Sequence, residues 1–404
     1  MKKQWLRVAF FNLFLVACIG VILRYKIAFS LPFIDQKHLL HGHSHFAFSG
    51  WITHVLYVLL VIQLSYKKKE VVFKEYQQLI NLNLITAYGM LLSFPIQGYG
   101  PISIGFSTCS IIVSFVFARK YWKDLNTTYS NRASTWAIQF ALFANIISSL
   151  GTFALAYMMA TKNVEQNWYL ASVYFFLHFQ YNGWFFFAIL GLLFFQLEKI
   201  KELLPKLKSI FWLFCVSCIP AYFLSALWLP IPNWIYFVVL IAAILQTIAM
   251  IQLIIGIHTY QKLILALIPK ETKWFWTLSG IACSIKILLQ LGSTIPSLSQ
   301  LAFGFRPIVI GYLHLVLLGF ISIFLITYTW STQMRFPNKK FQKAISLFVL
   351  GIIINEILLM TQGIAALKYW SIPYIDLGLL VAALIMFMGI GLTNIFISKC
   401  STTE

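Results

Sequence analysis

Long apolar segments separated by short polar breaks dominate the pattern of this sequence. A helix needs about 20 consecutive apolar residues to cross the hydrocarbon core of a bilayer. Segments of that kind recur along the whole chain, and proline often stands in the breaks between them. The pattern predicts an all-α polytopic membrane protein with twelve transmembrane helices, over residues 5–24, 40–65, 77–96, 101–119, 133–160, 168–196, 208–228, 232–257, 273–293, 307–330, 343–363 and 374–397.

The composition agrees with one integral membrane domain over residues 1–404. Of the 404 residues, 60% are hydrophobic and only 10% are charged, which is too little charge for a soluble domain of this length. We find no soluble domain, linker or clear internal repeat. The first segment lacks a signal-peptide cleavage pattern, so we expect it to be retained. The six cysteines form neither a disulfide framework nor a Cys-x-x-Cys-His haem-attachment motif.

The distribution of positive charge predicts the orientation in the membrane. A net charge of +19 would also suit a nucleic-acid partner, but the basic residues lie in short runs between the apolar segments, so we expect no nucleic acid. The side of the chain that includes both termini has 23 Lys and Arg residues, and the opposite side has 6. The remaining one is Lys286, within the ninth segment. The positive-inside rule therefore predicts a multi-pass protein of the inner (cytoplasmic) membrane with both termini in the cytoplasm.

Histidines are the most unusual feature of the apolar segments. Three of the eight histidines fall between residues 41 and 45, where the second segment begins. With the predicted topology, His45, His178 and His314 lie on three different helices, about 8–15 Å below the outer face of the membrane at 1.5 Å rise per residue. Polar groups at this depth are costly, and functional roles are common among them.

The histidines are the candidate ligands for a metal or a haem, because neutral imidazole binds iron, copper and zinc. We favour ligation for His43 or His45, with a slight preference for His45, and for His314. His41 and His38 fit a ligand set and an interfacial turn equally well.

His178 shares a helix face with Tyr181 and Asn182, so a metal site and a hydrogen-bonded helix contact are both open there. Lys286 and Glu356 both lie in the outer halves of their helices, which suggests a mutual ion pair or a proton route. Arg306 is a candidate partner for a haem propionate or a plain interfacial anchor.

These motifs resemble a known group of proteins. Twelve helices with histidines on the second, sixth and tenth resemble the catalytic subunit of haem–copper oxidases and nitric-oxide reductases. The segment His43-Ser44-His45-Phe46-Ala47-Phe48-Ser49-Gly50 also resembles the His-x-His motif of the NnrS family, twelve-helix haem–copper membrane proteins linked to nitric-oxide tolerance.

The resemblance implies roles for individual residues. His45 (or His43) and His314 would hold a low-spin haem b, and His178 would match a copper ligand. Asn182 stands where oxidases have Tyr and nitric-oxide reductases have Glu. The seventh helix lacks the His-His pair and the tenth lacks the second histidine that the resemblance leads us to expect. The ligand set for a haem–copper binuclear centre of the oxidase type is therefore incomplete. The additional histidines of the second helix, His41 among them, are candidate replacement ligands.

The resemblance implies a membrane haem protein acting in redox or diatomic-gas chemistry with NO or O₂, in respiration or nitrosative-stress defence. Copper is a second candidate metal, and oxidoreductase activity is left open. The implied partners are the lipid bilayer, a separate electron-donor protein or quinol, and subunits of an oxidase complex. An assembly partner without a cofactor is one alternative. The other is a transporter or channel that uses its histidines for metal or proton handling. Broken helices or paired repeats would mark it, and the sequence reveals neither.

Overall fold

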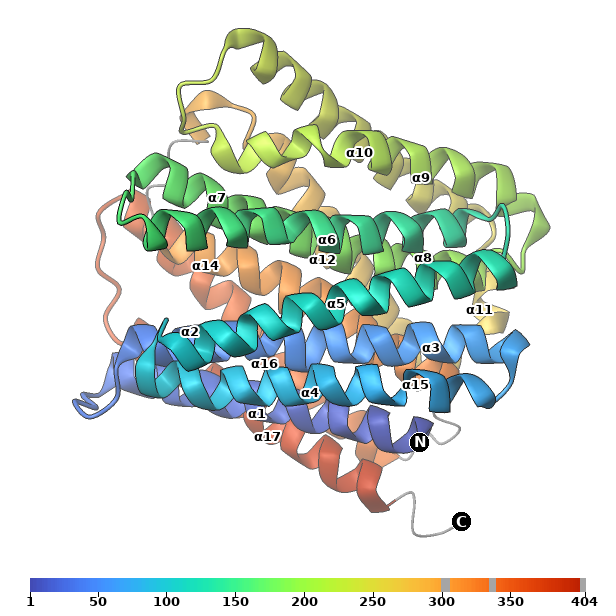
Figure 1. The fold of residues 1–404 in the computed structure, drawn as a ribbon, viewed down its shortest axis with the longest axis horizontal. Coiled ribbons are helices and arrows are strands. Elements are labelled where there is room, and N and C mark those ends of the chain that lie inside the picture. Colours follow the sequence, from blue (N-terminus) through green and yellow to red (C-terminus); the bar gives the residue numbers. More distant parts are fainter. Residues whose placement is uncertain (299–305, 334–338, 400–404) are drawn as a thin grey trace. The chain divides into compact units, whose positions relative to one another are not determined.

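The computed structural model describes residues 1–298, 306–333 and 339–399 (Figure 1). These residues contain helices and no strand. Eleven helical spans are long and apolar enough to cross a membrane, and a bent helix pair makes a twelfth if it is counted as one span. The expectation of an all-α, multi-pass membrane protein is thus confirmed at this level.

The chain divides into two compact units, each described by itself. The first comprises residues 1–117 and 325–404, and the second comprises residues 118–324. Helices that belong wholly or mainly to the first unit are α1 (Lys2–Ala28), α2 (Gln36–Phe46), the π-helix η1 (Ala47–Thr53), α3 (His54–Lys68), α4 (Val71–Gln97), α5 (Pro101–Thr128), α15 (Ile323–Gln333), α16 (Lys339–Leu367) and α17 (Ile375–Lys399).

The second unit has its own set of helices. They are α6 (Ala133–Ala160), α7 (Gln166–His178), the π-helix η2 (Phe179–Phe185), α8 (Phe186–Leu197), the short η3 (Lys201–Leu203), α9 (Leu204–Cys218), η4 (Pro220–Ala226), α10 (Asn233–Thr259), α11 (Gln261–Leu267), η5 (Lys270–Thr272), α12 (Lys273–Gly292), α14 (Arg306–His314) and the π-helix η6 (Leu315–Ser322).

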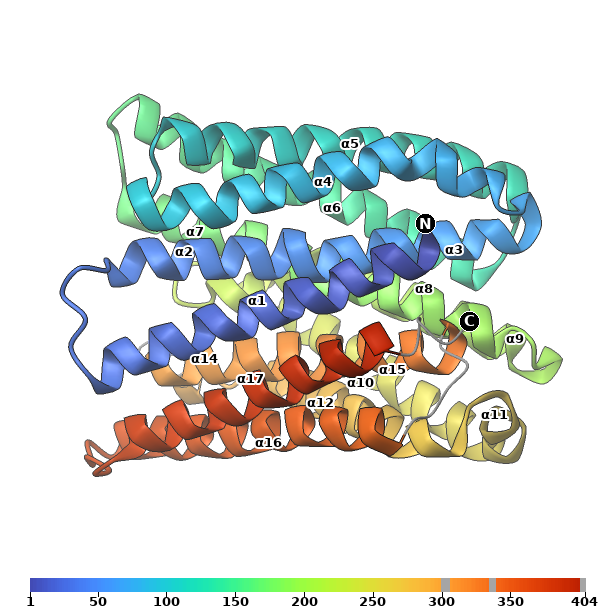
Figure 2. The same ribbon diagram turned by 90° about the horizontal axis from the view of Figure 1, so that it is seen from below.

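In the first unit, the two helices at the ends of the chain pack against each other. α17 contacts both α1 and α16, and α1 and α17 run antiparallel (Figure 2). Asn394 Nδ2 donates a hydrogen bond to the Phe10 carbonyl oxygen at 3.1 Å, and the Phe14 and Phe387 rings stack at 5.0 Å. The start of α1 and the end of α17 therefore lie at the same end of this unit. The cytoplasmic location of that end stays a prediction.

Two spans form the interior of their units. The span Gln36–Lys68, made of α2, η1 and α3, is 83% buried over its most apolar window, and so is Gln166–Leu197, made of α7, η2 and α8. No other span in the described part of the chain exceeds 50%. The spans that contain His45 and His178 are thus mostly enclosed by protein, whereas the span that contains His314 is 50% buried.

Outer helices instead expose large apolar side chains. On α10 they recur every three or four residues, which places them on one helix face. They are Phe237, Ile241, Ile244, Ile248 and Ile251, and each is at least 40% exposed. A continuous apolar stripe of this kind suits contact with lipid chains, in agreement with the bilayer as a partner.

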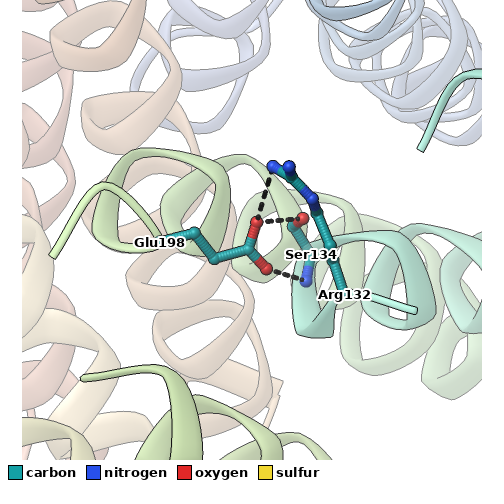
Figure 3. Close-up of polar contacts among 3 residues, drawn as sticks. All are labelled: Arg132, Ser134 and Glu198. Carbon is teal, nitrogen blue, oxygen red and sulfur yellow. Dashed lines mark hydrogen bonds and ion pairs between the residues drawn. The ribbon is translucent and has the colours of Figure 1, made fainter. Parts of the chain in front are cut away.

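A buried carboxylate joins two spans of the second unit. Glu198, directly after α8, accepts hydrogen bonds from Ser134 N at 2.9 Å and Ser134 Oγ at 2.8 Å (Figure 3). Ser134 is the second residue of α6, so Glu198 satisfies a backbone donor that the first helical turn leaves unpaired. The exposed Arg132 lies 3.8 Å from the same carboxylate.

The seventh span departs from the expected continuous helix over 208–228. α9 ends at Cys218, and the chain bends by 47° before η4, which begins at Pro220. Proline cannot donate the backbone hydrogen bond that would continue the α-helix. The bent pair forms either a broken span or a re-entrant loop, a feature that the sequence pattern did not reveal.

Candidate functional site

The three histidines that the sequence places at one depth share a local structure. His178 is the last residue of α7 and His314 is the last of α14, and a π-helix follows each directly. His45 lies two residues before the π-helix η1. Counted from the histidine, glycine is the fifth residue and an aromatic the sixth in every case: Gly50 and Trp51, Gly183 and Trp184, Gly319 and Phe320.

We name these segments the His–π segments: 45–53, 178–185 and 314–322. π-Helical turns are rare and concentrate at functional sites. The sequence contained the signal, since aligning the chain on the three histidines aligns the glycines and the aromatics. A search for long repeats overlooks it because the shared positions are few.

In each His–π segment, a neighbouring helix supplies a donor to a backbone carbonyl. Gly50 O accepts from Asn12 Nδ2 at 2.5 Å, and Phe320 O accepts from Ser279 Oγ at 3.0 Å. Asn182 O lies 3.7 Å from Cys218 Sγ, a weak thiol donor. A π-turn interrupts the regular i to i−4 ladder, and within a membrane any carbonyl it releases must find a partner inside the protein. Side chains on α1, α9 and α12 thus contact one carbonyl in each segment, and Phe320 O also accepts from Ile323 N.

Two of the glycines are required by close packing. A Cβ at Gly50 would lie 2.5 Å from the buried Phe46 ring, and one at Gly183 would lie 2.5 Å from Ala144 Cβ on α6. Both distances are shorter than van der Waals contact. At Gly319 the nearest atom would be 3.5 Å away, an ordinary contact.

His41 and His45 lie together near the start of the second span, the end that the sequence predicts to be on the outer side of the membrane. The His45 ring stacks on Phe94 at 4.4 Å, and its Nε2 lies 3.4 Å from Tyr99 Oη. The His41 ring contacts Tyr99 edge-on at 4.7 Å. His41 Nε2 is buried and has no hydrogen-bond partner among the described residues. His43 points elsewhere, because its Cε1 lies close to Gly20 on α1.

Asp35 fixes the start of this helix. Its carboxylate accepts a hydrogen bond from His38 N at 2.7 Å, which caps α2. The same bond lowers the pKa of Asp35 below its usual value of 3.8. The cap places His38, His41 and His45 on one face, as their spacing predicts.

His178 is fully buried, and both of its ring nitrogens are engaged. Nε2 lies 2.9 Å from the Cys218 carbonyl oxygen, and Nδ1 lies 3.1 Å from Asn182 Nδ2. The carbonyl accepts and the amide donates, so Nε2 is protonated and Nδ1 is not. A metal at Nδ1 requires Asn182 to move away. This bonding fits the hydrogen-bonded alternative of the sequence analysis, and the metal alternative stays a prediction.

His314 has a different arrangement. Its Nδ1 lies 2.8 Å from the Ile310 carbonyl oxygen, one turn earlier in α14. This bond protonates Nδ1 and leaves the lone pair on Nε2, the tautomer that a metal ligand needs. Arg306 is exposed at the start of the same helix.

The structure does not gather these residues into one metal centre. No group of three or more His, Cys, Asp or Glu side chains within 1–298, 306–333 and 339–399 is arranged to hold a metal ion. His41, His43 and His45 belong to the first unit, and His178, Arg306 and His314 to the second. Haem ligation by His45 and His314 therefore stays a prediction, as does every ligand assignment.

Lys286 and Glu356, for which the sequence suggests an ion pair, also belong to different units. Within the described residues of its own unit, Lys286 has no carboxylate partner, whereas Glu356 interacts electrostatically with Arg24. Glu356 accepts a hydrogen bond from Asn355 at 3.1 Å, and Lys286 Nζ lies 4.9 Å from the centre of the Phe186 ring.

The fold and site define a candidate multi-pass membrane protein with three recurring His–π segments. In comparisons with known proteins, the chain matches no protein-family model and no curated protein. The resemblance to haem–copper oxidases and the NnrS family thus rests on the short motifs alone.

Proposed function

We propose that this protein is a haem protein of the cytoplasmic membrane that acts in redox or diatomic-gas chemistry with NO or O₂. The recurrence of one histidine in three His–π segments carries the proposal. A histidine needed only for packing has no reason to recur with the same glycine and aromatic spacing in three spans. Copper is the second candidate metal, and a separate protein or quinol would donate electrons.

The donor atoms fit such a group. His314 has its lone pair on Nε2, and the His45 ring lies in an aromatic setting formed by Phe94 and Tyr99. Following the resemblance, we assign haem b ligation to His314 and to His45 (or His43), and the propionate contact to Arg306. A haem iron with two histidine ligands transfers electrons, and an open sixth position binds a diatomic gas.

The test is the absorption spectrum of protein purified from cells that make haem, combined with metal analysis. We expect a Soret band in the natural protein, and its loss or shift in His314→Ala and His45→Ala. His258→Ala is the matched control, because His258 is exposed near the end of α10. Folded protein without a Soret band would refute the proposal.

Transport is the second candidate function, favoured by the bend in the seventh span. Interrupted helices are typical of transporter binding sites. The 47° bend between α9 and η4 supplies the feature that the sequence lacked. Purified protein in liposomes would then take up protons or a transition metal, and His45→Ala would slow the uptake. Haem-free protein with this activity would favour transport over the haem proposal.

A further inference from the structure

Lys286 is a buried cation without a carboxylate partner among the described residues. It lies on α12 with 2% of its surface exposed, and its Nζ lies over the face of the Phe186 ring at 4.9 Å. An aromatic face stabilises a cation partially. It does not replace the lone-pair acceptors that the three N–H groups of an ammonium need. Burying an ammonium group without hydrogen-bond acceptors is costly, so further acceptors are needed nearby.

A small cavity lies against Lys286. It is lined by residues from five helical elements of the second unit: Asn182 of η2, Phe186 and Phe187 of α8, Phe214 and Cys218 of α9, Gln246 of α10, and Lys286 and Ile287 of α12. Asn182 and Gln246 are 5% and 6% exposed. Asn182 Oδ1 and Gln246 Oε1 are both buried and accept no hydrogen bond from the described residues. One cavity thus combines a buried donor with two unsatisfied acceptors.

We propose that this cavity binds a water molecule that accepts a hydrogen bond from Lys286 and donates to Asn182 Oδ1 and Gln246 Oε1. The chemistry of the lining selects water over ions. Two amide oxygens disfavour an anion, and the ammonium group disfavours a metal cation. The cavity has room for about one water, and a buried water typically makes about three hydrogen bonds.

The water extends a chain of hydrogen bonds to a His–π segment. Asn182 Nδ2 already donates to His178 Nδ1 at 3.1 Å, and His178 Nε2 donates to the Cys218 carbonyl oxygen at 2.9 Å. Lys286 is thereby joined to His178 through water and Asn182. The proposed water site does not depend on the proposed function. Only the importance of this water for chemistry at His178 rests on the proposed function.

Radiolytic footprinting tests the site, because X-ray pulses convert bound water into hydroxyl radicals that oxidise adjacent side chains. Two buried cysteines allow a comparison within one residue type. Cys218 lines the cavity and is 2% exposed, whereas Cys283 does not line it and is 6% exposed. We expect Cys218 to be oxidised faster than Cys283, the reverse of their exposure. In Gln246→Leu and Lys286→Met, the rate at Cys218 should fall to that of Cys283.

The rate at Cys283 serves as the folding control, since partial unfolding would increase it. If Cys218 in the natural protein is oxidised no faster than Cys283, the cavity is dry and the inference is wrong, whether or not the variants fold. An unchanged Cys218 rate in both folded variants also contradicts it. Absence of a Soret band from the folded natural protein refutes only the proposed function, so the two failures are distinguishable.

Discussion

Asn12 supplies the sharpest test of what holds a His–π segment in place. This fully buried side chain of α1 donates from Nδ2 to Gly50 O at 2.5 Å and accepts at Oδ1 from Tyr88 Oη at 2.6 Å. It therefore connects η1 to both α1 and α4. Asn12→Leu keeps the branching at Cγ and removes both hydrogen bonds.

The magnitude follows from the setting. Hydrogen bonds between helices in membranes contribute about 0.6 kcal/mol on average and at most about 1.7 kcal/mol. Two lost bonds give about 1–3 kcal/mol for Asn12→Leu, and one lost bond gives about 0.6–1.7 kcal/mol for Tyr88→Phe. Because both changes remove the Tyr88–Asn12 bond, the double variant should cost little more than Asn12→Leu alone.

The assay is reversible unfolding in SDS, followed by tryptophan fluorescence, for the natural protein, both single variants and the double variant. Equal costs of Tyr88→Phe in the two backgrounds would mean that Tyr88 and Asn12 do not interact. If Asn12→Leu costs no more than Tyr88→Phe, then the bond to Gly50 contributes nothing. Either result would mean that Asn12 does not stabilise the π-turn of η1 through these bonds.

Three further predictions concern caps and close packing. Glu198→Gln should lower the free energy of unfolding by about 1–3 kcal/mol, because hydrogen bonds to a charged acceptor are stronger than those to a neutral one. Arg132→Gln, at the exposed partner, should lower it by less than about 1 kcal/mol. Equal losses in the two variants would contradict the capping role of Glu198. Gly183→Ala should cost about 1–3 kcal/mol through overpacking against α6, and Gly319→Ala, with its 3.5 Å clearance, clearly less; thermal unfolding of both compares them. The carboxyl carbon of Asp35 should titrate below pH 3.8 by NMR, because its bond to His38 lowers the pKa. The cap's contribution is then complete above that value and is lost as the pH falls through the lowered pKa, whereas a midpoint at or above 3.8 would refute the cap.

The sequence predicts the number and order of the spans well, because hydrophobic runs of membrane length have few alternative structures. The seventh span was the exception. Its run over 208–228 is apolar enough to cross, but Pro220 lies within it and bends the chain by 47°. Hydropathy averages over a window and does not register one missing backbone donor.

The candidate site was predictable only as a set of residues. Helical spacing correctly placed His38, His41 and His45 on one face, and His43 on another. The π-turn after each histidine was not predicted, and the side chains that contact these turns, such as Asn12 for η1 and Ser279 for η6, lie far away in the sequence. Local helix propensity contains no information about a hydrogen-bond partner that belongs to another helix.

His178 and His314 should respond differently to the same substitution, because their ring nitrogens are used differently. His178→Ala leaves Asn182 Nδ2 and the Cys218 carbonyl oxygen unsatisfied in the protein interior, at a cost of about 1–3 kcal/mol for each such group. His314 Nδ1 bonds to Ile310 O within its own helix turn, and we expect His314→Ala to change the haem spectrum more than His178→Ala does.

SDS unfolding and the Soret band, measured on the same two preparations, separate the roles. A large loss of stability with an unchanged spectrum would identify His178 as a structural residue. Loss of bound copper from His178→Ala with unchanged stability would instead support ligation, because the metal must then have replaced Asn182 at Nδ1. Stability and spectrum, measured together, therefore decide whether each histidine holds the fold or binds the metal.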